Sequence, residues 1–425
     1  MIWSSLIELD VLLNIVLLIV FGLISLRHVN LHLTDTFLFA RLVPFLMVLG
    51  LGEGDLLTTV VSLEMLMAVL TGIIMRAFPN FEAHLLLVLA FVANAFLIHS
   101  VDFISFLVCL EAQNFCFFVL CALLGTRTCA SFTLESSLKY FVLSSLTTGV
   151  LLYWMSLLYL ETGSTSFLFS TLTCSNSVSL TFVLVALLFK LGAAPLHVWL
   201  MPLFTSVHRS LLLYATTLPK LSLFGFWINT AHGLIGPSSL LLFAAFSLFI
   251  GSLGAYQAPV LRHMLAFSTV NELGLLLMAV ESAGFHSLLQ HLVIYCVTQT
   301  VLWNTHHTAF LSLVALSLAG IPPLAGFFGK AFIFWHVSSV GLFGILAIAL
   351  CSTLLSVVFY IRLIRLATTH ALPNAHSEGH TGQLRALIGH RHPAHTLITP
   401  RASLLALGLL LLLAMPLGVI KPFVF

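Results

Sequence analysis

The sequence predicts an all-α membrane protein that crosses the bilayer many times. Of its 425 residues 60% are apolar and 7% are charged, and the mean hydropathy is +1.13. Soluble globular domains carry about 25% charged residues. Apolar runs near the roughly 20 residues that a membrane helix needs recur from Leu6 almost to the C-terminus. This composition excludes a soluble fold.

Polar residues divide the apolar sequence into about fourteen predicted spans. Their approximate centres are Val16, Pro44, Met67, Ala90, Phe115, Ser145, Phe189, Lys220, Phe246, Gly274, Tyr295, Ala319, Ala349 and Leu410. Arginines outside the spans fall in or beside the odd-numbered loops, whereas the even-numbered loops carry acids such as Glu53 and Glu161. Because basic loops stay on the side of synthesis, the odd loops are expected to face the cytoplasm or the mitochondrial matrix.

Charge and cysteine usage exclude other classes of protein. The net charge is +2 and no basic run is present, which argues against nucleic acid as a partner. Seven cysteines contain no CxxC pair and are interpreted as small apolar residues. The N-terminus MIWSSLIELD lacks the features of a signal or import peptide, so we expect insertion where the chain is made. A polar loop at 367–402 holds six histidines; it is expected to be a solvated linker, with a metal site as the alternative.

Four of the five lysines, Lys139, Lys190, Lys220 and Lys330, lie inside apolar spans, while arginine supplies nearly all loop charge. A lysine at the bilayer centre costs about 3 kcal/mol, so a function is expected for each. Burial lowers the pKa of a lysine amine, which then can load and release a proton, whereas arginine stays charged. We therefore predict a proton relay. The alternatives are fixed ion pairs that lock helices together, or amines that reach the membrane surface.

A buried carboxylate would complete this chemistry, because it holds a nearby lysine charged until the two separate. Glu111 is the main candidate, since it lies in mid-span beside Gln113 and Asn114. For Glu272 and Glu64, which are also flanked by apolar residues, a relay role and simple local pairing both remain open.

Two helices are predicted to be broken within the membrane. In LLFKLGAAPLHVWL, Gly192 and Pro195 follow Lys190, and in LSLAGIPPLAGFFGK, Pro322 and Pro323 precede Lys330. Transporters accept such breaks where the backbone lines a polar cavity. The matching positions suggest a repeat of five spans. His197, just after the first break, is either a relay residue or a backbone cap.

These segments resemble the antiporter-like membrane subunits of respiratory complex I, most closely the chain 2/subunit N family. The resemblance runs in order through LKYF, FKLGAAPLHVW, LPKL, GSLGAYQAPVLRHMLAFSTVNELG and SLAGIPPLAGFFGK. It implies about fourteen helices with two inverted five-helix repeats, each containing a broken helix. The implied segments are 1–80, repeats 81–232 and 233–366, the loop 367–402 and a last helix 403–425.

By the same resemblance, the expected proton relay contains Glu111, Lys139, Lys190, His197, Lys220 and Lys330. Glu272 is added as a carboxylate for the proton path of the second half. Glu272 departs from the family pattern, because relatives often have histidine there, and MPLFTSVHRS lacks the acid that usually follows this motif. No metal or cofactor is expected in this chain; NADH, FMN, iron-sulfur clusters and ubiquinone would belong to other subunits. Expected partners are antiporter-like subunit 4, the small membrane subunits and phospholipids, including cardiolipin.

The resemblance therefore implies a non-redox, proton-translocating subunit of NADH:ubiquinone oxidoreductase, driven by quinone reduction elsewhere in the complex. A cation/proton antiporter subunit and a scaffold without transport are the alternative functions. The expected location is the mitochondrial inner membrane, with the bacterial plasma membrane as the alternative.

Overall fold

The computed structural model describes residues 55–78, 80–123, 130–167, 178–230, 239–304, 308–322 and 324–369. The first two predicted spans, the last span, the His-rich loop beyond residue 369 and Pro323 lie outside these ranges. In the described ranges the chain forms thirteen helices, and the prediction of an all-α protein is confirmed. Helices dominate because a backbone in lipid must satisfy its own hydrogen bonds.

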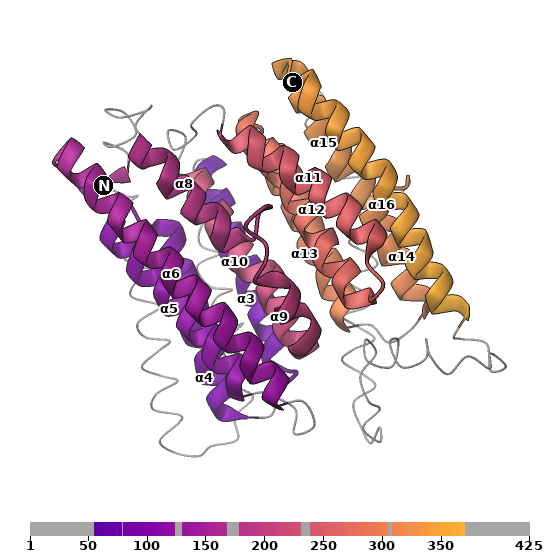
Figure 1. Cartoon of the computed structure of the whole chain (residues 1–425), viewed down its shortest axis with the longest axis horizontal. Helices are drawn as coiled ribbons and strands as arrows, with labels where there is room; N and C mark the ends of the chain where they lie inside the picture. Colours follow the sequence, from indigo (N-terminus) through magenta and orange to yellow (C-terminus); the bar gives the residue numbers. More distant parts are fainter. Residues whose placement is uncertain are drawn as a thin grey trace. The chain divides into compact units, whose positions relative to one another are not determined.

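The chain divides into two compact units, which are described separately. The first unit covers residues 1–191 and 206–236. Its helices, drawn in indigo to magenta in Figure 1, are α3 (Asp55–Met75), α4 (Phe81–His99), α5 (Phe103–Leu123), α6 (Ala130–Thr162), α8 (Val178–Leu191) and α10 (Arg209–Thr230). Helix α10 packs against α3 and α4, and α6 packs against α5 and α8.

The second unit covers residues 192–205 and 237–425. Its helices are α9 (Leu200–Ser206, all but its last residue), α11 (Ser239–Gln257), α12 (Leu261–Glu281), α13 (Phe285–Asn304), α14 (Thr308–Ala319), α15 (Ala325–Val340) and α16 (Phe343–Thr369). Helix α12 contacts α11, α13, α15 and α16. It therefore lies at the centre of this unit.

Seven of the described helices are long and apolar enough to cross a membrane. In α10 and α12, 89% of the membrane-length window is buried inside the structure, against 28% in α6. The two most buried helices carry Lys220 and Glu272, respectively. Each unit therefore places an ionisable residue on its central helix.

Glycines in a left-handed backbone conformation end the two helices that precede the predicted breaks. Gly192 follows α8 with φ of +81°, and Gly320 follows α14 with φ of +84°. Residues with a Cβ atom rarely adopt this conformation, so glycine favours a helix end here. The N–H groups of Gly320 and Ile321 both donate to the carbonyl of Leu316 at 3.2 Å, which closes the end of α14.

Candidate functional site

Lys190 and Glu111 form a long ion pair in the first unit. Lys190 lies in the last turn of α8, and its Nζ atom is 3.7 Å from Oε1 of Glu111 on α5. The amine also donates to the carbonyl of Ser144 on α6 at 2.8 Å. The lysine side chain is 6% exposed, whereas the glutamate side chain is 42% exposed. The amine is thus enclosed by three helices, while the carboxylate keeps an open side.

Two polar side chains orient Glu111. The Asn114 amide, one helical turn further along α5, donates to Glu111 Oε1 at 3.4 Å. The Tyr140 hydroxyl on α6 donates to the Asn114 oxygen at 2.9 Å. Residues three apart lie on the same face of a helix, which explains how Asn114 reaches the carboxylate. This chain of hydrogen bonds links α6 to the ion pair through a second route besides Ser144.

Lys220 lies in the interior of the first unit, 4% exposed, immediately after Pro219 inside α10. Proline has no N–H group, so the carbonyl of Ala215, one turn earlier, loses its partner within the helix. The sequence therefore places a buried amine next to a locally weakened helix.

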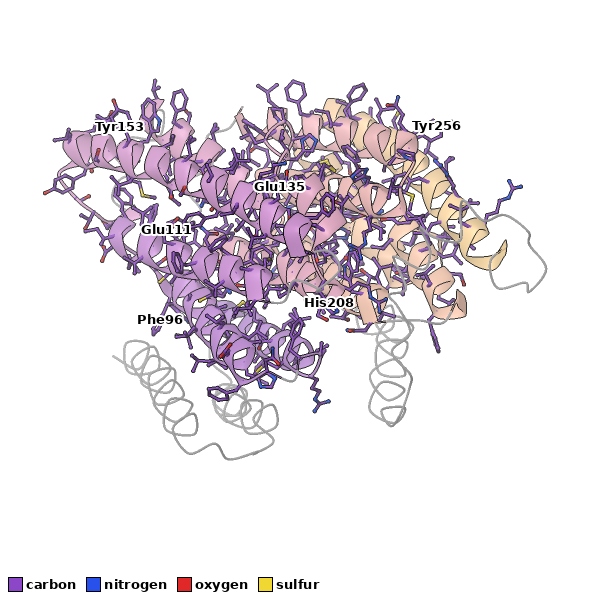
Figure 2. All side chains as sticks on the ribbon, turned by 60° about the horizontal axis from the view of Figure 1, so that its bottom comes forward. Phe96, Glu111, Glu135, Tyr153, His208 and Tyr256 are labelled. Atoms are coloured by element: carbon purple, nitrogen blue, oxygen red, sulfur yellow. The ribbon has the colours of Figure 1, made fainter. Side chains whose placement is uncertain are left out.

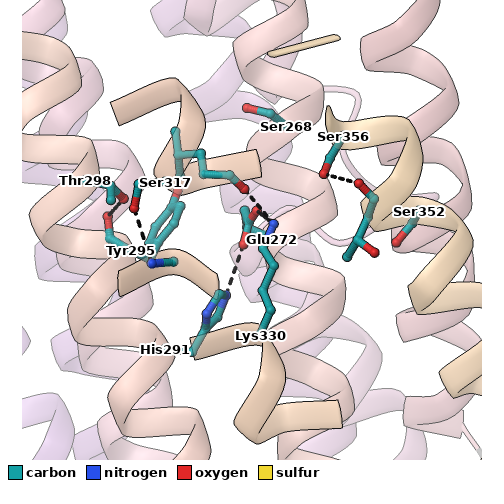
Figure 3. Close-up of polar contacts among 12 residues, drawn as sticks. Ser268, Glu272, His291, Tyr295, Thr298, Ser317, Lys330, Ser352 and Ser356 are labelled. Carbon is teal, nitrogen blue, oxygen red and sulfur yellow. Dashed lines mark hydrogen bonds and ion pairs between the residues drawn. The ribbon is translucent and has the colours of Figure 1, made fainter. Parts of the chain in front are cut away.

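A tighter cluster lies in the second unit (Figure 3). Nζ of Lys330 on α15 is 3.0 Å from Oε1 of Glu272 on α12, and Nε2 of His291 on α13 is 3.0 Å from Oε2. Lys330 also donates to the carbonyl of Leu318, near the end of α14, at 2.6 Å. All three side chains are at most 5% exposed. Four helices therefore meet around one carboxylate.

The geometry of this second cluster satisfies the conditions for burying charge. A buried ion pair is tolerable only when additional hydrogen bonds satisfy its remaining atoms. Glu272 has a positively charged or N–H partner at each oxygen, and Lys330 has a carbonyl besides the carboxylate. The carbonyl end of α14 favours a positive charge as well.

His197 lies between α8 and α9 and is half-buried, with its ring centroid 5.8 Å from that of Phe267. Gly192 and Pro195 lie in the same connection, and Pro322 lies between α14 and α15. The relay role of His197 stays a prediction. In the described part of the chain no three His, Cys, Asp or Glu side chains come together in a way that could hold a metal ion.

Comparison with known proteins places this chain in a family. A family model described as "NADH:quinone oxidoreductase/Mrp antiporter, TM" matches residues 100–306 and 304–356. NADH-ubiquinone oxidoreductase chain 2 of Chlamydomonas reinhardtii is 44% identical over 371 residues, which are 87% of this chain and 92% of that protein. This chain belongs to the chain 2/subunit N family. The resemblance seen in the sequence is thereby confirmed.

Two further comparisons extend the family match. NADH-quinone oxidoreductase subunit N 1 of Acidiphilium cryptum is 28% identical, covering 67% of this chain and 68% of that protein. A chain in the structure of respiratory complex I from Thermus thermophilus with bound aureothin is similar in fold, with a TM-score of 0.71 and 22% identity. The match covers 94% of this chain and 97% of the other. This family member is thus a multi-pass protein of the mitochondrial inner membrane or the bacterial plasma membrane.

Lys139 of this family member lies apart from the enclosed clusters, on the outer side of α6. Its amine is 2.6 Å from Glu135, one turn earlier, and the two side chains are 56% and 57% exposed. Glu135 and Glu111 are both labelled in Figure 2, on α6 and α5. The relay role of Lys139 stays a prediction from the resemblance.

We expect Lys139→Gln to leave stability nearly unchanged, because exposed ion pairs contribute about 0–1 kcal/mol. The measurement is the thermal unfolding midpoint of the purified assembly that contains this chain. Glu135→Gln, which removes the other partner, is the matched variant. A large drop with either change would show that a neighbouring protein buries this pair.

Sequence reasoning missed several members of the clusters in this chain 2/subunit N protein. His291 and Tyr140 are polar side chains inside apolar spans, which is the same signal that marks the lysines. Glu64, for which both roles were open, is 2.7 Å from Nε2 of His99. This contact joins α3 to α4 and is separate from the Glu111 pair.

Proposed function

We propose that this chain carries protons across the membrane as a subunit of a respiratory NADH:quinone oxidoreductase. The observation that carries the proposal is the enclosed Lys190 amine with a single, partly open carboxylate at 3.7 Å. At that distance the ion pair is loose, so a modest movement of Glu111 can separate it. The amine then loses the charge that keeps it protonated.

The proposed path runs from the Glu111–Lys190 pair through Lys220 to Lys330 and Glu272. Support comes from the burial of every amine on this path in its own unit, together with the family membership. Lys139 and His197 are included as further members of the relay, on the basis of their sequence positions and the resemblance. We further propose fourteen helices arranged as two inverted five-helix repeats, covering 81–232 and 233–366.

The chain is proposed to have no redox step of its own. Quinone reduction elsewhere in the complex would shift charge towards Glu111 and so drive the relay. NADH, FMN, iron-sulfur clusters and ubiquinone are assigned to other subunits. The proposed neighbours are antiporter-like subunit 4 and the small membrane subunits, with cardiolipin among the lipids, in the mitochondrial inner membrane.

Replacing Lys190 tests this function. Lys190→Arg keeps a cation beside Glu111 but cannot release its proton, because the guanidinium stays charged. We expect the complex to assemble and coupled NADH:quinone turnover to fall by about tenfold. This loss is smaller than the roughly 10²–10⁴-fold that a positioned acid–base group contributes. Turnover and proton flux are measured together in vesicles, per assembled complex. Lys190→Met is expected to show the same loss of flux.

The matched control is Arg76→Met, which removes an exposed cation just after α3 in the same unit. It is expected to behave as wild type. Wild-type proton flux in Lys190→Arg would instead identify the Glu111–Lys190 pair as a fixed link between helices, and the relay would have to be abandoned.

The second candidate function is a cation/proton antiporter subunit, because the matching family model also covers Mrp antiporters. Purification separates the two. Association with NADH-oxidising, iron-sulfur subunits supports the first function, and association with small antiporter chains supports the second.

A further inference from the structure

His291 is a buried ionisable residue that is not part of the proposed proton path. It is 3% exposed and lies on α13, facing the central helix α12. Among the described residues, its one polar contact is to Glu272, which is also the partner of Lys330. The same carboxylate therefore has two nitrogen bases, one on each side (Figure 3).

The two oxygens of Glu272 are divided between the two bases. Oε1 faces Nζ of Lys330 at 3.0 Å, and Oε2 faces Nε2 of His291 at 3.0 Å. An ionised carboxylate only accepts hydrogen bonds, so Nε2 carries the hydrogen and donates it to Oε2. In neutral imidazole this leaves the lone pair at the other ring nitrogen, Nδ1.

Nδ1 of His291 is buried and has no hydrogen-bond partner among the described residues. It points towards Gly329, the residue before Lys330: a Cβ atom at that glycine would lie 2.8 Å from Nδ1. The missing side chain at position 329 thus leaves the basic nitrogen unobstructed. A buried polar atom without a partner is costly and calls for an explanation in the function of the protein.

Discharge of Lys330 poses an electrostatic problem that His291 can solve. If the Lys330 amine gave up its proton with nothing else changed, the Glu272 carboxylate would remain buried without a counter-ion, which is strongly unfavourable. A proton bound at Nδ1 makes His291 an imidazolium that already touches Oε2. The charge of the three-residue cluster then stays constant while Lys330 becomes neutral.

We propose that His291 is a proton-binding residue of the relay and the alternate counter-ion of Glu272. One proton binds at Nδ1 of His291, and one leaves Nζ of Lys330; the reverse exchange reloads the lysine. The remaining ionisable side chains within electrostatic range of Glu272, in the described part of the chain, are the phenols of Tyr295 and Tyr360. This inference rests on the proposed proton-carrying function.

His291→Gln is the decisive substitution, because a glutamine amide can still donate to Glu272 but cannot bind a proton. In the assembled complex, reconstituted in vesicles, we expect coupled turnover and proton flux to fall by about tenfold. The second readout is the redox-induced infrared difference spectrum of complex with ¹⁵N-labelled histidine. Imidazolium bands should appear in wild type and be absent in His291→Gln.

His286→Gln is the matched control, since His286 lies on the same helix and is exposed. It should keep wild-type flux and the imidazolium bands. Gly329→Ala is an independent variant: it retains all three ionisable groups but places a methyl group against Nδ1, and it should also lower the flux. All activities are normalised to the amount of assembled complex.

Wild-type flux and unchanged infrared bands in His291→Gln would overturn the inference and leave His291 as a neutral donor that orients Glu272. Loss of assembly in both His291→Gln and Gly329→Ala would also overturn it, in favour of a purely structural contact. The Lys190→Arg variant distinguishes failure of this inference from failure of the proposed proton-carrying function. If Lys190→Arg blocks pumping while His291→Gln does not, only the role of His291 fails.

Discussion

Replacing Glu272 with leucine is expected to prevent accumulation of the assembled complex. The substitution leaves the Lys330 amine and the His291 imidazole buried without their shared carboxylate. Removing one partner of a buried ion pair costs about 3–5 kcal/mol. The whole stability of a folded domain is about 5–15 kcal/mol, so this loss is severe. The measurement is the amount of intact complex on a native gel.

A double variant provides the internal control for this prediction. Glu272→Leu combined with Lys330→Met removes both charges, and it should recover part of the assembly, because an apolar pair of similar volume can replace a buried ion pair. It should not pump protons. Glu281 lies at the end of the same helix, and its Oε2 atom has no hydrogen-bond partner in the described structure. The Glu281→Leu variant should therefore assemble normally. Normal assembly of Glu272→Leu alone would show that this carboxylate is not a structural requirement.

Gly326→Ala is expected to have a similarly large effect on folding. Gly326 is the second residue of α15, and a Cβ atom there would lie 1.8 Å from the carbonyl oxygen of Ser317 on α14. No rotamer change relieves a clash between a Cβ atom and a backbone atom. Overpacking of a core typically costs about 1–3 kcal/mol, and a contact this short should exceed that range. The helix break before Lys330 would have to open, which should lower the yield of folded chain.

Gly344→Ala is the matched substitution, since Gly344 lies near the start of α16 and a Cβ atom there meets nothing within 4 Å. Its yield and thermal unfolding midpoint should equal wild type or slightly exceed it, because alanine favours a helix over glycine. Equal yields of Gly326→Ala and Gly344→Ala would show that α14 and α15 are not as closely packed at this point.

The features that could be predicted from the sequence are those that depend on neighbouring residues. Helices follow from hydropathy, because lipid leaves a spanning backbone few alternatives. The family follows from motifs such as FKLGAAPLHVW, and both are confirmed. In each of the two proposed broken helices, the first half ends at a glycine, Gly192 or Gly320. The local sequence alone marks these glycines as helix ends. The number of spans and the inverted repeats stay predictions.

The pairing of charges was less predictable, because it depends on how several helices rotate about their axes. Glu111 was expected to lie near a buried lysine; the structure gives Lys190 as that lysine, with a separation of 3.7 Å. For Glu272 the sequence left relay and local pairing open, and nothing in it indicated that α12, α13 and α15 bring Lys330 and His291 to opposite oxygens. His291 was missed because no neighbouring motif or helix break marks it in the sequence, unlike His197.

The length of α6 has a consequence for the outward-facing Glu135–Lys139 pair. Its 33 residues make a rod about 50 Å long, whereas the hydrocarbon layer is about 30 Å thick. Residues 140–162 alone reach about 35 Å, enough to cross that layer. If the helix stands upright, residues 130–139, nearly three turns, project among the lipid headgroups, where water and phosphates solvate both charges. A strongly inclined rod would instead draw the pair towards the acyl chains.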